Sequence, residues 1–212
     1  MEFQDEQDEI EINMLKSELK ATLELEKRKN LGNTNLLHVL KIIVTQNPAW
    51  LRYKYVKYLR LAQYHVGGIL GLIYTKKMNS IGNKLGFEMS GKNIGPGLLL
   101  YHNGPIVING NAILGKNVSF HGDNCVGNNG VTNECPVIGD NVDIGVGAKI
   151  LGGIKIANNV TIGAGSVVVS SIEEENAVVV GVPGKILKIA NCKNKLNTYH
   201  NKHLVDFDYL RR

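Results

Sequence analysis

The sequence predicts a mainly β protein, a parallel β-helix built from hexapeptide repeats and preceded by an α-helical region. Three observations support this fold class. Apolar residues recur at every sixth position through the second half of the chain, glycine is abundant with 24 residues in 212, and the first part shows helical spacing instead. Spacings of three and four mark an amphipathic helix, so a six-residue period argues against helix in the second half.

The first part of the chain, residues 1–82, is predicted to hold an acidic tail followed by helices. Residues 1–9 are strongly acidic and are expected to be disordered. A helix is predicted over 9–29, because apolar residues there step by three and four and form one narrow stripe. The stripe consists of Ile12, Leu15, Leu19 and Leu23.

Two more helices are predicted before the repeats begin. The second runs from about residue 35 to 46. Asn47 followed by Pro48 is typical of a helix cap with proline at the first helical position, so a third helix is predicted over about 50–78.

The repeat region, residues 83–190, has a direct physical interpretation. Three hexads make one triangular coil, a large apolar residue of each hexad fills the interior, and corners such as Gly139-Asp140-Asn141 adopt turns that bulky side chains resist. Stacked coils pair their strands in parallel and bury an apolar column that no single coil buries. Ten of the eleven residues in this column are apolar: Ile108, Leu114, Phe120, Val126, Thr132, Ile138, Ile144, Ile150, Ile156, Ile162 and Val168.

Charge and cysteine content narrow the possible partners and the compartment. The net charge is +5, yet nine of the nineteen acidic residues lie within the first 26, so the remainder is distinctly basic. Nucleic acid, an anionic membrane surface or a polyphosphorylated cofactor would each suit such a body. The three cysteines show no CxxC pairing, and no apolar run is long enough to span a bilayer, which favours a cytoplasmic protein without a zinc site.

The hexads resemble those of the left-handed β-helix acyltransferases. Within that superfamily the chain is most similar to the serine acetyltransferase-like branch, which includes capsule and exopolysaccharide O-acetyltransferases. The resemblance covers about residues 85–188 and implies acetyl-CoA as co-substrate, no metal, and a homotrimer with active sites between adjacent subunits. The matching segments are LGFE at 85–88, IGPGL at 94–98, YHNG at 101–104, IVINGNA at 106–112, IGDN at 138–141, GAKILG at 147–152 and VGVPGK at 180–185.

His102 occupies the position of the catalytic histidine of that family. Acetyl transfer from a thioester to a hydroxyl needs a base that removes the proton as the oxygen attacks, and histidine suits this role. The family's orienting carboxylate would fall on Phe87, and the residue before His102 is Tyr101 rather than aspartate. Glu88 is therefore the candidate that holds the required tautomer of His102, the alternative being an exposed charge at a coil edge.

Four further residues are candidates for acceptor binding. His121 follows His102 by nineteen residues, near the length of one coil, so the two histidines are expected on one edge of the β-helix. His121 would bind acceptor hydroxyls or support the oxyanion, or else it is a surface imidazole. Asp123, Asn128 and Asn129 either line an acceptor groove or form turns, and for the asparagines the turn interpretation is favoured.

The resemblance places coenzyme A along the last coils, mainly on backbone groups. The expected contacts lie near Val146, Ala164, Val169 and Ser170. Lys185 and Lys188 would meet phosphates through charge-assisted hydrogen bonds.

The acceptor is predicted to be a saccharide of a capsule, exopolysaccharide or glycolipid precursor. Serine acetyltransferases recognise a carboxylate with a basic loop, whereas the corresponding segment 130–136 has no Arg or His and contributes Glu134. Serine O-acetylation stays an alternative, as does a catalytically silent scaffold or binding module. The basic and aromatic segment 50–60 suggests contact with the inner face of a membrane, the alternative being a helix packed on the β-helix. Nucleic-acid binding is not expected, because no groove-reading motif accompanies the basic residues.

Overall fold

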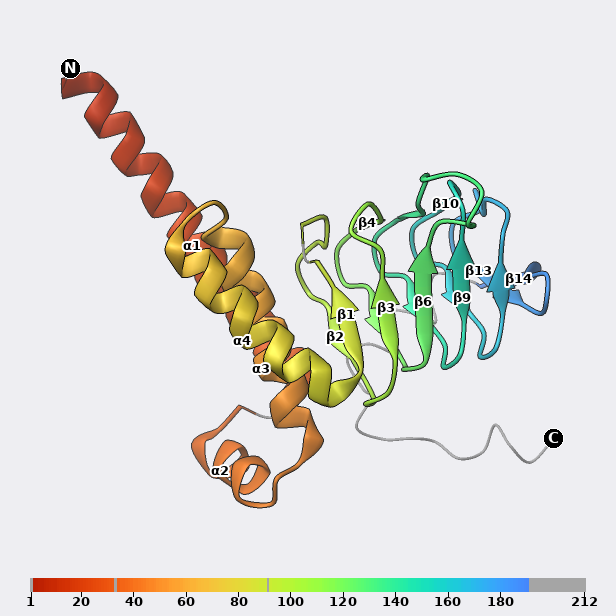
Figure 1. Ribbon diagram of the computed structural model, residues 1–212, viewed down its shortest axis with the longest axis horizontal. Coiled ribbons are helices and arrows are strands. Elements are labelled where there is room, and N and C mark those ends of the chain that lie inside the picture. The colour runs from red at the N-terminus through yellow and green to blue at the C-terminus, as the bar shows by residue number, and fades with distance from the viewer. Residues whose placement is uncertain (1, 33, 91, 191–212) are drawn as a thin grey trace.

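A helical region and a triangular β-helix lie end to end in this protein (Figure 1). The computed structural model describes residues 2–32, 34–90 and 92–190, with side chains from residue 14 onward. The predicted fold class is confirmed. The predicted C-terminal tail, 191–212, lies outside the described residues, and so does Cys192.

Four helices precede the first strand, and the last of them ends three residues beyond the predicted boundary at 82. The Asn35 side chain accepts from the N–H of His38 at 2.8 Å and caps the second helix, while Asn47 accepts from the N–H of Ala49 at 2.9 Å and caps the third. The predicted asparagine-proline start is therefore confirmed. The helices are α1 (Glu2–Leu31), α2 (Leu36–Val44), α3 (Pro48–Tyr64) and α4 (Ile69–Leu85).

Two expectations about the helices are wrong. Helix α1 already begins at Glu2, so residues 2–9 are helical rather than disordered. This segment contains no glycine or proline, so no residue in it opposes a helix strongly. The single helix expected over 50–78 is in fact α3 and α4, because Gly67 adopts a φ of 83° and a Cβ at Gly71 would clash with the carbonyl group of His65.

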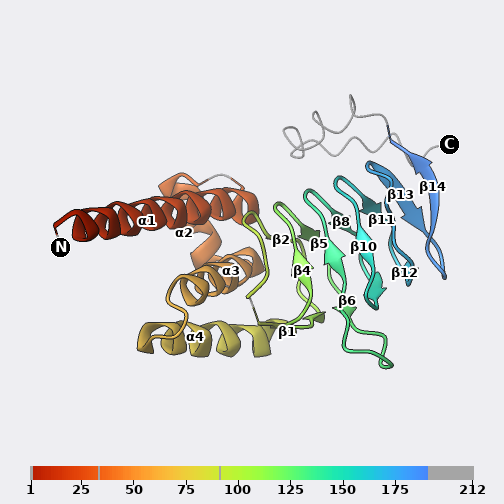
Figure 2. The same cartoon turned by 90° about the horizontal axis from the view of Figure 1, so that it is seen from above.

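Helix α3 lies between α1 and α4 (Figure 2). No side chain from residue 50 to 60 is exposed, and Tyr55, Val56 and Leu59 are at most 1% accessible. This packing gives no support to the predicted membrane contact through residues 50–60, which stays a prediction. Within the described part of the chain, no helix combines the length and apolarity needed to cross a bilayer.

The strands form three sheets, one on each face of the triangle, and stack along the axis (Figure 2). All pairings are parallel except the last, between β13 and β14. The five-stranded sheet contains β1 (Phe87–Met89), β3 (Ile106–Ile108), β6 (Asn124–Gly127), β9 (Lys149–Leu151) and β12 (Val167–Val168). The three-stranded sheet contains β4 (Ile113–Leu114), β7 (Val137–Ile138) and β10 (Lys155–Ile156). The six-stranded sheet contains β2 (Leu99–Leu100), β5 (Ser119–Phe120), β8 (Asp143–Ile144), β11 (Thr161–Ile162), β13 (Ala177–Val180) and β14 (Lys185–Ile189).

The predicted apolar column fills the interior of the coils. All ten of its apolar members are at most 4% accessible, whereas Thr132 is exposed. Val126 pairs with Ile108, 18 residues earlier, and with Ile150, 24 residues later, so the coil between β6 and β9 is one hexad longer. The extra hexad forms a loop after β6 that extends from the body (Figure 2). Because this loop inserts six residues, Thr132 keeps the six-residue spacing of the column although it lies in the loop and not in the interior.

Asparagines turn one corner of the triangle in successive coils. Asn117, Asn141, Asn159 and Asn176 adopt left-handed φ values of 57–61°. The side-chain amides also form a ladder, with Asn117 donating to Asn141 and Asn141 donating to Asn159, each at 3.1 Å. Asparagine tolerates this backbone conformation and links coil to coil, so it serves these corners better than other non-glycine residues.

Side chains of α1 and α3 close the open end of the six-stranded sheet. Oε1 of Glu26 accepts from Nε and Nη2 of Arg60 and from the backbone N–H groups of Gly97 and Leu98, and Nη1 and Nη2 of Arg60 also donate to backbone carbonyls. Asn30 adds hydrogen bonds to the carbonyl of Leu98 and the N–H of Leu100. These bonds pair backbone groups that the edge strand β2 would otherwise leave open.

Candidate active site

The turns leading from the six-stranded sheet into the five-stranded sheet stack along one edge of the β-helix. We call this edge the histidine corner; it comprises residues 101–105, 121–123, 145–148 and 163–166. Backbone hydrogen bonds between successive turns hold them in register, such as the 2.9 Å bond from the N–H of Gly147 to the carbonyl of Gly122. Five predicted site residues come together here: His102, His121, Asp123, Val146 and Ala164.

His102 is exposed in the turn between β2 and β3. Its ring meets the Tyr101 ring at a centroid distance of 6.4 Å. A Cβ added to Gly122, whose φ is 107°, would lie 3.6 Å from Cβ of His102, so a glycine in the next coil supports the histidine turn closely. Within the described residues no carboxylate hydrogen-bonds to this imidazole.

Glu88, the predicted orienting carboxylate, lies in the middle of β1, opposite Val107. Its side chain is exposed on the outer face of the five-stranded sheet. No hydrogen bond joins it to His102 in the described structure, and the pairing of these two residues stays a prediction. The two segments that carry them are nonetheless neighbours, because the N–H of Gly104 donates to the carbonyl of Leu85 at 3.1 Å.

His121, one coil further along, does have a carboxylate partner. Its Nε2 lies 2.9 Å from Oδ1 of Asp143 on β8, and both side chains keep part of their surface accessible, at 27% and 20%. The Tyr101 ring stacks on the His121 ring at 4.3 Å with an interplanar angle of 21°. The expectation that the two histidines share one edge is thereby met, and Tyr101 links them physically.

Asp123 forms an ion pair with Lys149. The Lys149 ammonium donates to the backbone carbonyl of Asp123 at 2.6 Å and to its Oδ1 at 3.3 Å. Asp123 also adopts a left-handed φ of 53°, as residues in tight turns do. This geometry gives Asp123 a turn-forming role. Its carboxylate is exposed, but an acceptor that bound it would also meet the ammonium group of Lys149.

A groove of about 960 Å³ lies between the second half of α4 and the outer face of the five-stranded sheet. Amide side chains are the recurring polar groups in its wall, and a carboxylate and a hydroxyl join them. Gly86 also lines the groove and packs against Gly104 of the histidine turn, so the groove adjoins the histidine corner. Its polar side chains are Asn79, Asn83, Glu88, Ser90, Asn109 and Asn128.

Asn128 and Asn129 behave as the turn interpretation predicts. Oδ1 of Asn128 accepts from the N–H of Gly130 at 3.3 Å, and Oδ1 of Asn129 accepts from the N–H groups of Val131 and Thr132 at 3.0 Å. Asn128 also lines the groove, whereas Asn129 is exposed in the loop beyond it. Of the two, only Asn128 lines the groove, and it does so at the end of β6 that lies opposite the histidine corner.

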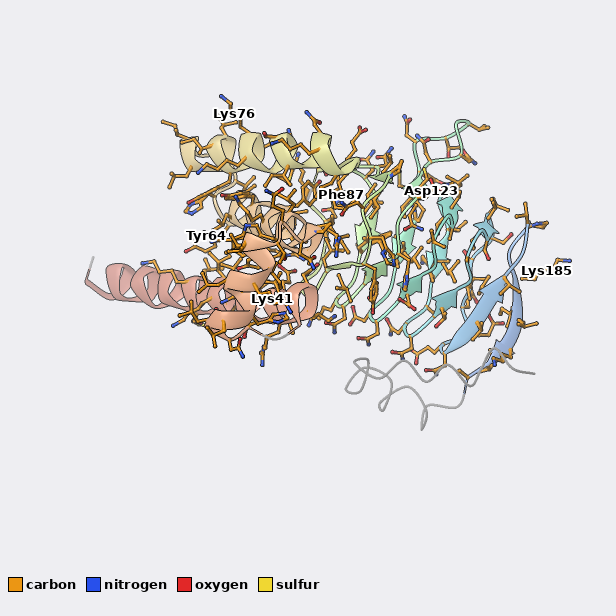
Figure 3. The ribbon with its side chains drawn as sticks, turned by 90° about the horizontal axis from the view of Figure 1, so that it is seen from below. Lys41, Tyr64, Lys76, Phe87, Asp123 and Lys185 are labelled. Atoms are coloured by element: carbon orange, nitrogen blue, oxygen red, sulfur yellow. The ribbon has the colours of Figure 1, made fainter. Side chains whose placement is uncertain are left out.

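The residues predicted to contact coenzyme A fall into three places. Val146 and Ala164 are exposed on the histidine corner, directly beyond His121 along the axis. Val169 and Ser170 follow β12 and lie at the opposite end of the five-stranded sheet's strands. Lys185 and Lys188 lie on the antiparallel strand β14, and Lys185 points away from the far end of the body (Figure 3).

Arg52 lies near the site, although no motif in the sequence indicated a role for it there. Its Nη1 donates to Oδ1 of Asn103 at 3.0 Å, next to His102 in the chain. Asp143 was likewise missed, because only the stacking of β5 on β8 brings it to His121. Among the described residues, no three His, Cys, Asp or Glu side chains are grouped as a metal site requires.

The sequence matches no family model and no curated protein. Solved structures do match. A serine acetyltransferase from Brucella abortus strain S19 in complex with coenzyme A is 25% identical, with a TM-score of 0.66 over 86% of this chain and 72% of that one. The Neisseria gonorrhoeae enzyme in complex with serine is 28% identical, with a TM-score of 0.59 over 82% and 69%.

A third match, a serine acetyltransferase in complex with cysteine, is 25% identical with a TM-score of 0.57. The alignment covers 65% of this chain and only 58% of that enzyme, so this chain spans well under two thirds of its length. These likenesses confirm the predicted left-handed β-helix and agree with the predicted resemblance to the serine acetyltransferase-like branch.

Proposed function

We propose that this chain, which shares the fold of the serine acetyltransferases, is an acetyl-CoA-dependent O-acetyltransferase that modifies a hydroxyl of a saccharide. The observation that carries the proposal is the histidine corner, where an exposed His102 and a carboxylate-held His121 come from successive coils. Two matching enzymes, one in complex with coenzyme A and one with serine, support the acyltransferase class and the co-substrate.

His102 is the general base of the proposed reaction. It accepts the proton of the acceptor hydroxyl while the oxygen attacks the carbonyl carbon of the thioester. The new C–O bond forms, the C–S bond breaks, and the departing thiolate takes the proton back from His102, so the histidine is restored. His121 lies next along the corner and would bind the acceptor or the oxyanion of the tetrahedral intermediate.

The proposed path of coenzyme A continues along the same corner, over Val146 and Ala164. Small and exposed residues there let the pantetheine arm approach the backbone. Val169 and Ser170 follow β12 at the opposite end of its sheet from this corner, so they would meet the cofactor across a subunit boundary. Lys185 pairs with Val180, whose side chain lies against Gly163 of the corner, and Lys188 lies further along β14. The proposal therefore includes a homotrimer with sites between adjacent subunits.

Two features favour a saccharide acceptor. The groove on the outer face of the five-stranded sheet, which meets the histidine corner at Gly86, presents four asparagine amides, and amides both donate to and accept from sugar hydroxyls. The loop between β6 and β7 contains no Arg or His and contributes Glu134, so it offers no partner to an amino acid carboxylate.

Serine is a second candidate acceptor. The matched Neisseria gonorrhoeae enzyme holds serine in its structure, and the likeness extends over 82% of this chain. A silent scaffold has less support, because an exposed histidine beside a carboxylate-held histidine is an arrangement suited to proton transfer.

An acceptor panel tests the proposal. Purified protein is incubated with acetyl-CoA and with monosaccharides, oligosaccharides or serine, while thiol release is followed and products are weighed by mass spectrometry. We expect one saccharide to gain an acetyl group, and His102→Ala to lower kcat by about 100- to 10,000-fold. Because His102 is exposed, its replacement should leave the melting temperature unchanged.

Three results would contradict parts of the proposal. Thiol release with serine alone would replace the saccharide by serine as acceptor. Undiminished turnover in His102→Ala would remove the assigned base. Absence of transfer to every acceptor would favour the scaffold alternative.

A further inference from the structure

Arg52 is an arginine that the fold leaves without an anionic partner. Its side chain is only partly accessible, and Nε is buried without a hydrogen-bond partner. Among the described residues its one hydrogen bond is to the neutral amide oxygen of Asn103, and no carboxylate lies within ion-pair distance. Burial lowers the pKa of the guanidinium from its usual value, but arginine remains charged at neutral pH.

The same helix shows how this protein treats an arginine that serves the fold. Arg60, eight residues later on α3, donates from Nε and Nη2 to Glu26 and makes further bonds to backbone carbonyls of the first coil. Its charge is compensated and its donors are used. Arg52 differs on both counts, although it is partly withdrawn from water and its Nε is buried.

A cation that loses water without gaining an anion destabilises the fold, because desolvation disfavours the charged form and nothing offsets it. Such an arrangement is explained when an anion binds there during function. The place is informative: Asn103 follows His102 directly, and the peptide between them rests on Gly122. The guanidinium is therefore hydrogen-bonded to the residue that directly follows the proposed base.

We propose that Arg52 binds an anionic group of the acceptor, a carboxylate, and so orients the hydroxyl toward His102. This inference rests on the proposed function and names its substrate class. A guanidinium binds a carboxylate through two parallel hydrogen bonds, which fixes direction as well as position. The cation that the loop between β6 and β7 lacks would thus come from α3, about 80 residues earlier in the chain.

Two sources supply a hydroxyl near a carboxylate: an acidic sugar and serine. Three matched pairs of compounds distinguish these two sources, and the members of each pair differ by the carboxylate. Glucuronate is compared with glucose, galacturonate with galactose, and serine with ethanolamine, which keeps the hydroxyl and the amine. Each compound is tested for acetylation with acetyl-CoA and, without acetyl-CoA, for binding by calorimetry.

We expect the carboxylate member of at least one pair to bind and react about 10- to 100-fold better than its neutral partner. Arg52→Gln should abolish that preference by weakening only the carboxylate member, and Arg52→Lys should retain part of it. Lys57→Gln removes one positive charge from the same helix and serves as the matched control. Circular dichroism and the melting temperature verify that each variant is folded.

Equal binding of both members in all three pairs by the unmodified protein would overturn the inference without any variant. A preference that survives in folded Arg52→Gln would also overturn it, because the anion would then be read elsewhere. Preference for serine over ethanolamine alone would keep the role of Arg52 and replace the saccharide as acceptor. Carboxylate binding lost in Arg52→Gln, but without acetyl transfer to any compound, would keep the anion site and contradict the proposed enzyme.

Discussion

Nε2 of His121 lies 2.9 Å from Oδ1 of Asp143, and the ring of Tyr101 covers the imidazole at 4.3 Å. The carboxylate can accept this hydrogen bond only when Nε2 carries a hydrogen. Asp143 therefore favours the ring forms that are protonated at Nε2, whether or not Nδ1 also carries a hydrogen. Tyr101 precedes His102 directly, and the stack therefore couples the two histidine turns. The two residues of this pair are 22 positions apart in the chain, His121 in the turn after β5 and Asp143 on β8.

Replacing Asp143 by asparagine tests the pair. An asparagine amide can donate to Nε2 and so favour the opposite tautomer, as a carboxamide does beside a catalytic histidine. We expect Asp143→Asn to lower kcat/KM by at least about tenfold, measured as thiol release from acetyl-CoA. Glu174→Gln, which removes an exposed carboxylate remote from the corner, is the control. Equal rates for the two variants would show that His121 does not take part.

Replacing Glu88 by glutamine separates two roles of that carboxylate. The structure places Glu88 in the groove wall without a hydrogen bond to His102. We therefore expect Glu88→Gln to raise the acceptor KM several-fold, by about 1 kcal/mol of lost binding, with kcat unchanged. Steady-state kinetics with varied acceptor measures both constants. A fall in kcat at constant KM would instead support the predicted role in orienting His102.

Breaking the Glu26–Arg60 pair should destabilise the whole chain. Both side chains are almost completely buried, at 1% and 4% accessibility, and Oε1 of Glu26 also accepts from two backbone N–H groups. Removing one partner leaves the other as an uncompensated buried charge. We expect Arg60→Met to lower the free energy of unfolding by about 3–5 kcal/mol in urea titrations. Lys27→Met, a partly exposed cation on α1, should change it by less than about 1 kcal/mol.

The asparagine corners allow a paired substitution. Asn141 combines a left-handed φ of 57° with two amide ladder bonds. Asn141→Ala removes the ladder bonds and places alanine in a left-handed backbone conformation that it disfavours. We therefore expect this variant to lower the free energy of unfolding by about 2–3 kcal/mol, measured by thermal unfolding. Asn141→Gly loses the ladder alone and should cost about 1 kcal/mol less. If glycine proves the worse replacement, backbone conformation is not the controlling factor at this corner.

The sequence predicted the β-helix well because its period is local and repeated. A residue at every sixth position reports directly on burial, and all ten apolar members of the column are interior. The cap at Asn47 was predicted equally well, since its side chain binds an N–H group only two residues further along the chain. Asn35 was predicted as the first residue of the second helix, whereas it is its cap. The break between α3 and α4 was missed, although Gly67-Gly68 marks it, because apolar residues continue across the break.

What the sequence determined by itself was the coil register, and with it the placement of His102 and His121 on one edge, because both depend on spacing along the chain. The tertiary structure decided which groups surround them. Asp143 reaches His121 only through the stacking of coils, and Arg52 reaches Asn103 only because α3 packs against the first coil. Such contacts depend on how separate elements dock, and docking depends on side-chain packing and paired charges that no local pattern records.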